Sequence, residues 1–195
     1  IELDEMRYGP EHIETATSIN NLALLYEKQG LYRKAQSLFL RSLPIVERTM
    51  GPEHPRTAKA LNNLGLVYSG LGLNDMAEHL LVRSIAIDER IFSPEHPSLA
   101  AGLNNLGYVY GSQGLFNKAI SLMVRVLTIN EKAVGTDHWK NVYSLNILSD
   151  LYINLGNIRK ALDTQRRSLQ IQLNIIQREP PFFVIFVRKS FIQSF

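Results

Sequence analysis

Three asparagines, spaced 42 residues apart, carry the side chains with the clearest chemistry in this sequence. A carboxamide can donate and accept hydrogen bonds, and an extended peptide backbone presents N–H and C=O groups that need both kinds of partner. Such side chains at a fixed interval therefore predict recognition of another chain's backbone. The alternative is that they bond to adjacent helices or loops and fix how repeats stack. These residues are Asn21, Asn63 and Asn105.

The asparagines belong to a pattern that recurs every 42 residues. The second copy opens with Gly51-Pro52-Glu53-His54-Pro55 and continues through Leu61-Asn62-Asn63-Leu64-Gly65. A weaker fourth copy has Ile147 in place of the second asparagine. A fixed period in this range is typical of proteins built from stacked repeats. We predict the end of a truncated preceding repeat at 1–8, four repeats at 9–50, 51–92, 93–134 and 135–176, and a non-repeat apolar tail at 177–195.

Each copy predicts two helices joined by a short turn. In the second copy Ala58, Leu61, Leu64 and Tyr68 recur at steps of three and four residues, the spacing of one helical face. Proline before the first helix and glycine after it are typical boundaries. Pro44 falls inside a predicted helix, where it should produce a kink. The predicted helix pairs are 13–29 with 32–49, 55–71 with 74–91, 97–113 with 116–133, and 139–155 with 158–176.

The row of Asn21, Asn63 and Asn105, called here the asparagine ladder, needs apolar neighbours to bind a peptide. Asn63 lies about 100° around its helix from Leu64 and about 140° from Tyr68, so it points away from the buried face. A neutral hydrogen bond contributes about 0.5–1.5 kcal/mol net, and three of them fall short of the roughly 8 kcal/mol of micromolar binding. We therefore expect side-chain pockets at the apolar positions near the asparagines. These positions are Leu24, Leu66 and Tyr108.

Composition excludes several other kinds of function. The net charge is only +3 and no basic block marks a nucleic-acid site. The chain has no cysteine, so disulfides and thiolate metal sites are excluded. No signal peptide and no apolar run of about 18 residues is present. We expect no nucleic-acid or membrane partner, and a cytoplasmic location.

The sequence resembles the tetratricopeptide repeat. The features that carry this resemblance are Leu-Gly/Ala-x-x-Tyr, a glycine, and an alanine five residues further on, across residues 9–176. The longer repeat and its Gly-Pro-Glu-His-Pro connector are similar to kinesin light chain and to bacterial multi-repeat proteins related to it. The resemblance implies an all-α fold, a right-handed α-solenoid of tandem helix-turn-helix repeats. It also implies that the first helices line a concave groove that binds extended peptides.

The same resemblance assigns the groove residues. It implies that the second asparagine of each Leu-Asn-Asn-Leu meets the peptide backbone, and it places a basic residue four positions earlier. Only Lys59 matches that basic position, because the other copies have Thr17, Ala101 and Tyr143. A second basic position, near the end of the second helix, is not matched in any copy. A preference for acidic peptides is therefore not implied.

Two further once-per-repeat rows have structural interpretations. Histidines in the connectors lie too far apart to share a metal ion, so we expect them to shape helix entry and expect no metal site. Arginines in the second helices should form inter-helix salt bridges, with a ligand-facing basic stripe as the alternative. No phosphate loop and no nucleophile–base pair is present, so we expect no enzyme and no cofactor. The rows are His12, His54, His96 and His138, and Arg41, Arg83, Arg125 and Arg167.

We therefore predict a protein–protein interaction scaffold that binds extended peptide segments. The alternative is a regulatory or sensor arm of a larger protein whose effector domain lies outside this fragment. Nucleic-acid binding by helical repeats is a third hypothesis, but it requires a basic groove that the asparagine positions do not supply. We also expect self-association through the array ends, because ends expose apolar faces. The tail is expected to be poorly ordered or to fold over the last repeat; a docked strand, a partner-binding segment or a sequence artefact are the alternatives.

Overall fold

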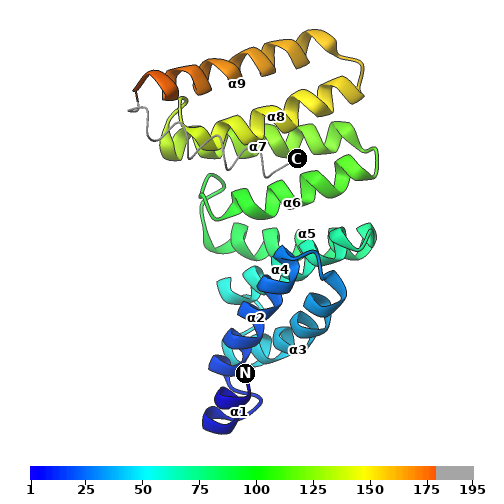
Figure 1. Ribbon diagram of the computed structural model, residues 1–195, viewed down its shortest axis with the longest axis vertical. Coiled ribbons are helices and arrows are strands. Elements are labelled where there is room, and N and C mark those ends of the chain that lie inside the picture. The colour runs from blue at the N-terminus through cyan, green and yellow to red at the C-terminus, as the bar shows by residue number, and fades with distance from the viewer. Residues whose placement is uncertain (179–195) are drawn as a thin grey trace. The chain divides into compact units, whose positions relative to one another are not determined.

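The computed structural model describes residues 1–178, and every regular element among them is a helix (Figure 1). The predicted helix pairs are confirmed, with ends that agree to within about two residues. The tail prediction falls almost entirely on residues 179–195, which lie outside the described part of the chain. The helices are α1 (Glu2–Tyr8), α2 (Ile13–Lys28), α3 (Tyr32–Met50), α4 (Pro55–Gly70), α5 (Asn74–Ile91), α6 (Leu99–Ser112), α7 (Phe116–Val134), α8 (Trp139–Asn154) and α9 (Ile158–Arg178).

The described part of the chain forms two compact units, residues 1–122 and 123–178, and α7 spans the boundary between them. In the first unit α2 packs against α3 and α4 packs against α5, which makes two helical hairpins. The hairpins stack in chain order, because α3 also packs against α4, and α5 against α6. In the second unit α8 packs against α9 as a further hairpin. The all-α fold of tandem helix-turn-helix units is therefore confirmed.

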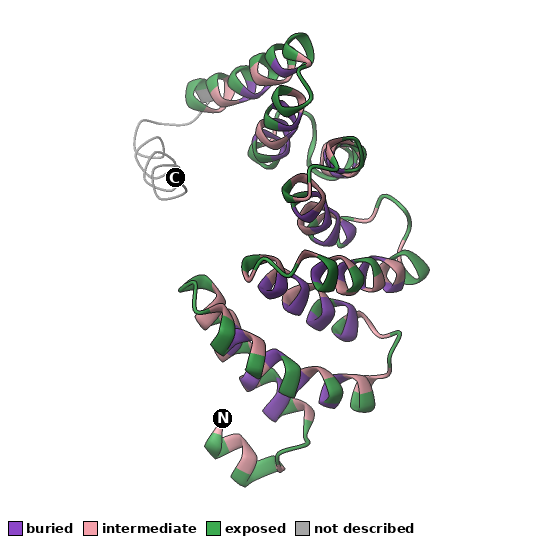
Figure 2. Ribbon diagram, turned by 90° about the vertical axis from the view of Figure 1, so that its right-hand side faces the viewer, coloured by how far each residue is buried: buried purple, intermediate pink, exposed green. Residues whose placement is uncertain are grey.

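Small and β-branched residues recur at the positions where the helices face one another. Figure 2 shows the buried residues on the facing sides of neighbouring helices within each unit. Two helices approach closely at Gly65, where an added Cβ would lie 2.8 Å from Cγ of Leu81 on α5. A small residue is therefore required on this side of α4. The buried rows are Ala35, Ala77, Ala119 and Ala161, and Ile45, Ile87, Ile129 and Ile171.

The turn inside each hairpin depends on a glycine. Gly30, Gly72, Gly114 and Gly156 have φ angles of 72°, 74°, 74° and 71°, in the left-handed region. Glycine adopts this conformation without the steric penalty that a Cβ brings, and it is the usual residue just after a helix. The turn therefore ends the first helix of each pair at the same point of the repeat.

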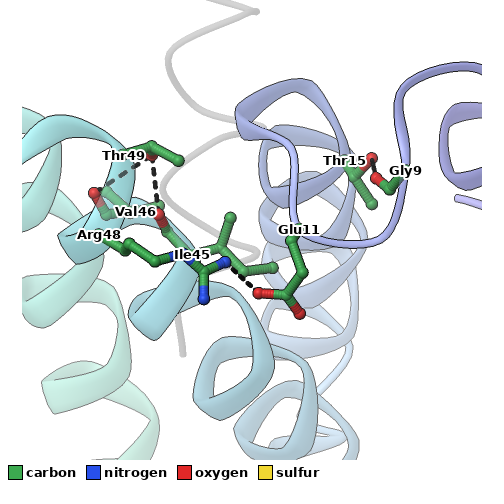
Figure 3. A network of polar contacts seen from close by, with 7 residues as sticks. All are labelled: Gly9, Glu11, Thr15, Ile45, Val46, Arg48 and Thr49. Carbon is green, nitrogen blue, oxygen red and sulfur yellow. Dashed lines mark hydrogen bonds and ion pairs between the residues drawn. The ribbon is translucent and has the colours of Figure 1, made fainter.

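The connector before three of the first helices is held by a side-chain hydrogen bond. Thr15 Oγ1 donates to the Gly9 carbonyl at 2.8 Å, and Thr57 Oγ1 donates to the Gly51 carbonyl at 2.7 Å. In the fourth copy Asn141 Nδ2 donates to the Gly135 carbonyl at 2.8 Å. Figure 3 shows the first of these bonds, together with the ion pair between Arg48 of α3 and Glu11 of the same connector.

The third copy departs from this arrangement. Leu99 occupies the position of the threonine and cannot donate a hydrogen bond. Helix α6 begins at Leu99, two residues later than the start that we predicted at Pro97. The imidazole of His96 stacks on the ring of Phe92, with 4.2 Å between ring centroids, as His12 stacks on Tyr8 in the first copy. The connector between α5 and α6 therefore differs from the other connectors in the missing hydrogen-bond donor and in the later start of its helix.

Helix α3 continues through Pro44, and a kink at that residue stays a prediction. No helix among residues 1–178 is both long enough and apolar enough to cross a bilayer.

Candidate functional site

A pocket of about 250 Å³ lies between α2 and α4 in the first unit. Helices α2 and α4 are the first helices of two successive hairpins, and Val46 of α3 also lines the pocket. The pocket thus lies on the helices that were predicted to form a groove. Its lining residues are Ile13, Thr17, Asn20, Asn21, Leu24, Val46, Arg56, Lys59, Ala60 and Asn63.

Helical spacing explains why these residues share a pocket. On α2 the residues Ile13, Thr17, Asn21 and Leu24 follow one another at steps of four, four and three, which places them along one helical face. On α4 the pocket residues lie between Arg56 and Asn63, which are seven residues apart and share a face in the same way.

Four of the seven predicted groove residues line this pocket, namely Asn21, Leu24, Lys59 and Asn63. The other three are Leu66, Asn105 and Tyr108, and they do not belong to its lining. Leu66 is half-buried on α4, and Tyr108 on α6 is 64% exposed.

Asn105 is already engaged within the protein. Its Nδ2 donates a hydrogen bond to Oδ1 of Asn62, 3.0 Å away on α4. By contrast, the carboxamides of Asn21 and Asn63 have no hydrogen-bond partner among the described residues. The ladder therefore has two free carboxamides at the pocket and one that joins successive repeats.

The first asparagine of each pair has a structural part in two hairpins. Asn20 Oδ1 accepts a hydrogen bond from Ser42 Oγ at 2.9 Å, and Asn146 Oδ1 accepts one from Ser168 Oγ at 2.7 Å. Each bond joins the two helices of one hairpin.

The pocket is positively charged. Arg56 and Lys59 both line it, and none of the lining residues is acidic. Neither basic side chain is paired with another group among the described residues. Sequence reasoning missed Arg56, because its counterparts in the other copies are Glu14, Ser98 and Lys140 and no repeat-wide pattern marks the position. The one available signal was its seven-residue separation from Asn63.

The connector histidines act at the starts of the first helices, as expected. Nδ1 of His54 accepts a hydrogen bond from the backbone N–H of Arg56 at 3.1 Å, and the other three histidines each accept one from the residue two positions further on. Such a bond satisfies one of the N–H groups that the first turn of a helix leaves without a partner. Among the described residues no group of three acidic, histidine or cysteine side chains is arranged to hold a metal ion.

Three arginines of the arginine row form salt bridges to an earlier helix of the chain. Arg83 Nη1 lies 2.7 Å from Oε1 of Glu47, and Arg41 and Arg167 pair in the same way with Glu5 and Glu131. The inter-helix interpretation is confirmed for these three residues.

The tetratricopeptide repeat family matches residues 1–48, 14–90, 56–132 and 98–174, in overlapping segments that cover most of the chain. The chain belongs to the tetratricopeptide repeat family.

Solved structures show which variety of tetratricopeptide repeat this is. A Podosopora anserina protein with nearly identical TPR-like repeats, described as a "putative kinesin light chain", aligns with a TM-score of 0.76 at 26% identity, over 87% of this chain and 81% of that chain. A single-substitution form of the same protein aligns equally well, over 80% of its length. BtubC (BKLC) from P. vanneervenii aligns with a TM-score of 0.77 at 23% identity, over 85% of this chain and 66% of that chain. The repeats are of the kinesin light chain-like variety.

Among curated proteins no sequence matches this chain. Tetratricopeptide repeats are in general scaffolds that bind proteins or peptides, and the kinesin light chain-like family is typically non-catalytic. The class of function therefore follows from the family.

Proposed function

We propose that this tetratricopeptide repeat protein binds an extended peptide segment of a partner protein, centred on the pocket between α2 and α4. The observation that carries the proposal is that Asn21 and Asn63, one repeat apart, line one pocket with free carboxamides. Two carboxamides in this arrangement can each bond to one stretch of peptide backbone, because each offers a donor and an acceptor.

The spacing of the helices suits such a ligand. Packed helices lie roughly 8–10 Å apart, and an extended chain advances about 3.3 Å per residue. Peptide groups about three residues apart would therefore meet Asn21 on α2 and Asn63 on α4. The side chains between them would enter the pocket, where Ile13, Leu24 and Val46 supply apolar contact.

Charge gives the pocket a preference among side chains. Arg56 and Lys59 bring two positive charges, and no lining residue neutralises them. A carboxylate on the peptide would form charge-assisted hydrogen bonds there, which are roughly twice as strong as neutral ones. We therefore propose that the bound segment carries a carboxylate beside an apolar side chain.

The proposal can be tested without knowledge of the partner. Peptides selected from a random display library on the intact chain would be measured by titration calorimetry against a double variant, Asn21→Ala with Asn63→Ala. Loss of two hydrogen bonds should weaken affinity by about tenfold or more. The matched control is Asn117→Ala, an exposed asparagine on α7 that does not line the pocket. Unchanged affinity in the double variant would show that the pocket asparagines do not bind the peptide.

A further inference from the structure

Helix α8 has a face that corresponds to the pocket-lining face of α2 but carries residues of different chemistry. Each residue of α2 has its counterpart on α8 three repeats later, 126 positions along the chain. The pocket-lining face of α2 is polar and aliphatic, whereas the same face of α8 carries two aromatic rings, an isoleucine and a carboxylate. Ile13, Thr17, Asn21 and Leu24 correspond to Trp139, Tyr143, Ile147 and Asp150.

This face of α8 is open to solvent. Trp139 is 62% exposed and Tyr143, one turn further on, is 59% exposed. Asp150 is exposed as well, and its carboxylate has no partner among residues 1–178. Large aromatic side chains are mostly buried in folded proteins, and an adjacent exposed pair is typical of an interaction site.

Beside the two aromatic rings the hydrogen-bonding groups of this face are mainly donors, and its carboxylate acceptor, Asp150, lies two turns beyond Tyr143 along α8. Ile147 replaces the asparagine and offers no acceptor to a peptide N–H. The Trp139 indole is a donor only, and the Tyr143 hydroxyl can donate as well. The face therefore suits a chain that has carbonyl acceptors but few N–H groups. Proline-rich segments have this property, because proline lacks the backbone N–H, and their preformed polyproline II helix packs against exposed aromatic rings.

We propose that α8 forms a subsite for a proline-rich segment that carries a basic side chain for Asp150. This inference rests on the proposed function, because it takes this helix face, like its counterpart on α2, to bind a peptide segment. Seven residues separate Tyr143 from Asp150, or about 10 Å along the helix, and a polyproline II chain advances about 3.1 Å per residue. The basic residue should therefore lie three positions from a proline that contacts Tyr143. Lys140 is exposed, but it lies about 100° around the helix from Trp139 and thus off this face.

Trp139 is the single tryptophan of the chain, so its fluorescence reports directly on this subsite. The probes are two peptides, Pro-Pro-Pro-Pro-Pro-Ala-Ala-Arg and its reverse, because polyproline II ligands can bind in either direction. Matched peptides replace the arginine by glutamate, or each proline by alanine. We expect a saturable change in Trp139 emission with at least one arginine peptide. Its affinity should exceed that of the glutamate peptide by about threefold, the range of an exposed ion pair. The alanine peptide should bind more weakly still.

Two variants locate the contacts. Tyr143→Ala should weaken binding of the arginine peptide by about fivefold, and Asp150→Arg should make the chain prefer the glutamate peptide. Both side chains are exposed, so the fold should be kept, which circular dichroism would check. Leu162→Ala, at a 65% exposed position on α9, is the control and should bind as the unchanged chain does. The inference is overturned by no saturable change with either arginine peptide, by equal binding of the alanine peptide, or by an Asp150→Arg variant with unaltered preference.

The outcome can be separated from that of the proposed function. The double variant Asn21→Ala with Asn63→Ala should leave the titration of the proline peptides unchanged, because neither residue belongs to α8. If library-selected peptides require Asn63 but no proline peptide perturbs Trp139, the second subsite alone is wrong. If proline peptides perturb Trp139 but no selected peptide depends on Asn21 or Asn63, the pocket assignment is wrong and the α8 subsite stands.

Discussion

The carboxamide of Asn105 donates to Oδ1 of Asn62, one repeat earlier, across 3.0 Å. Asn63 occupies the equivalent position in its own repeat, yet its carboxamide lines the pocket and has no partner among the described residues. Asparagines at the same position of successive repeats therefore differ in their hydrogen bonding. At Asn63 the amide is available to a ligand, and at Asn105 it is already used to join α6 to α4.

This difference predicts that substitutions at the two positions have separable effects. Asn105→Ala should lower the free energy of unfolding by about 1–2 kcal/mol, because it leaves the Asn62 oxygen without its donor. Asn63→Ala should change stability by less than about 0.5 kcal/mol and should weaken binding of a library-selected peptide. Urea denaturation and titration calorimetry on the same preparations would measure both quantities. Equal losses of stability in the two variants would contradict this assignment.

A second prediction concerns the charge of the pocket. Reversing both basic residues, Arg56→Glu with Lys59→Glu, should weaken binding of a carboxylate-bearing peptide and should also reverse the dependence of its affinity on salt. In the unchanged chain salt screens an attraction and lowers the affinity, whereas in the double variant it screens a repulsion and raises the affinity. Calorimetry at low salt and at about 0.3 M NaCl would measure this. The control is Lys28→Glu, an exposed residue of α2 outside the pocket. Equal salt dependence in the double variant and the unchanged chain would rule out the charge preference.

The helices could be predicted from the sequence because their boundaries depend on local groups. Pro55 starts α4, and Gly72 has the left-handed φ that closes the turn after it. The pocket was predicted in part for the same reason, since Asn21 and Asn63 lie on regular helix faces. The engagement of Asn105 could not be predicted, because it depends on how far one repeat lies from the next. Arg56 could not be predicted because an arginine occurs at this position in one repeat only, so the repeat pattern does not mark it.

A third prediction follows from the threonine in the connector. Thr57 is buried and its hydroxyl donates to the Gly51 carbonyl at 2.7 Å. Thr57→Val keeps the shape of the side chain but leaves that carbonyl without its donor, so the free energy of unfolding should fall by about 1–2 kcal/mol. Thr17→Val is the matched control, because Thr17 is exposed and bonds only to the Ile13 carbonyl within its own helix. If urea denaturation gives similar losses of unfolding free energy for the two variants, the connector hydrogen bond does not stabilise the fold.

A fourth prediction concerns the close contact between Gly65 of α4 and Leu81 of α5. Alanine is a better helix former than glycine by about 1 kcal/mol, yet Gly65→Ala should destabilise the protein by about 1–3 kcal/mol. The new Cβ would lie 2.8 Å from Cγ of Leu81, whose side chain is fully buried and has little room to move. A double-mutant cycle with Leu81→Ala would test this cause. We expect the Gly65→Ala penalty to disappear when Leu81 is shortened, and a penalty that persists would place the strain elsewhere.

The last prediction concerns the pH dependence of stability at Asp88. Burial raises the pKa of the Asp88 carboxyl above its ordinary value, and the nearby His96 offsets part of that rise. The corresponding residues in the other copies are Val46, Asn130 and Gln172, none of which carries a charge. The second copy is thus the one in which the residue at this position, Asp88, carries a charge at neutral pH.

Because the folded-state pKa of Asp88 is raised, the folded protein binds this proton more tightly than the unfolded chain does. The resulting stabilisation is fully present below the unfolded pKa, about 4, and is lost as the pH rises through the folded pKa. Asp88→Asn should therefore raise the urea midpoint at neutral pH, and the gain should shrink as the pH falls towards about 4, where the carboxyl is protonated. Asp163→Asn, at an exposed position on α9, makes the same chemical change and controls for the change in net charge. If the interaction with His96 outweighs burial, Asp88→Asn will instead lower the midpoint at neutral pH, and the pKa of Asp88 will prove to be lowered.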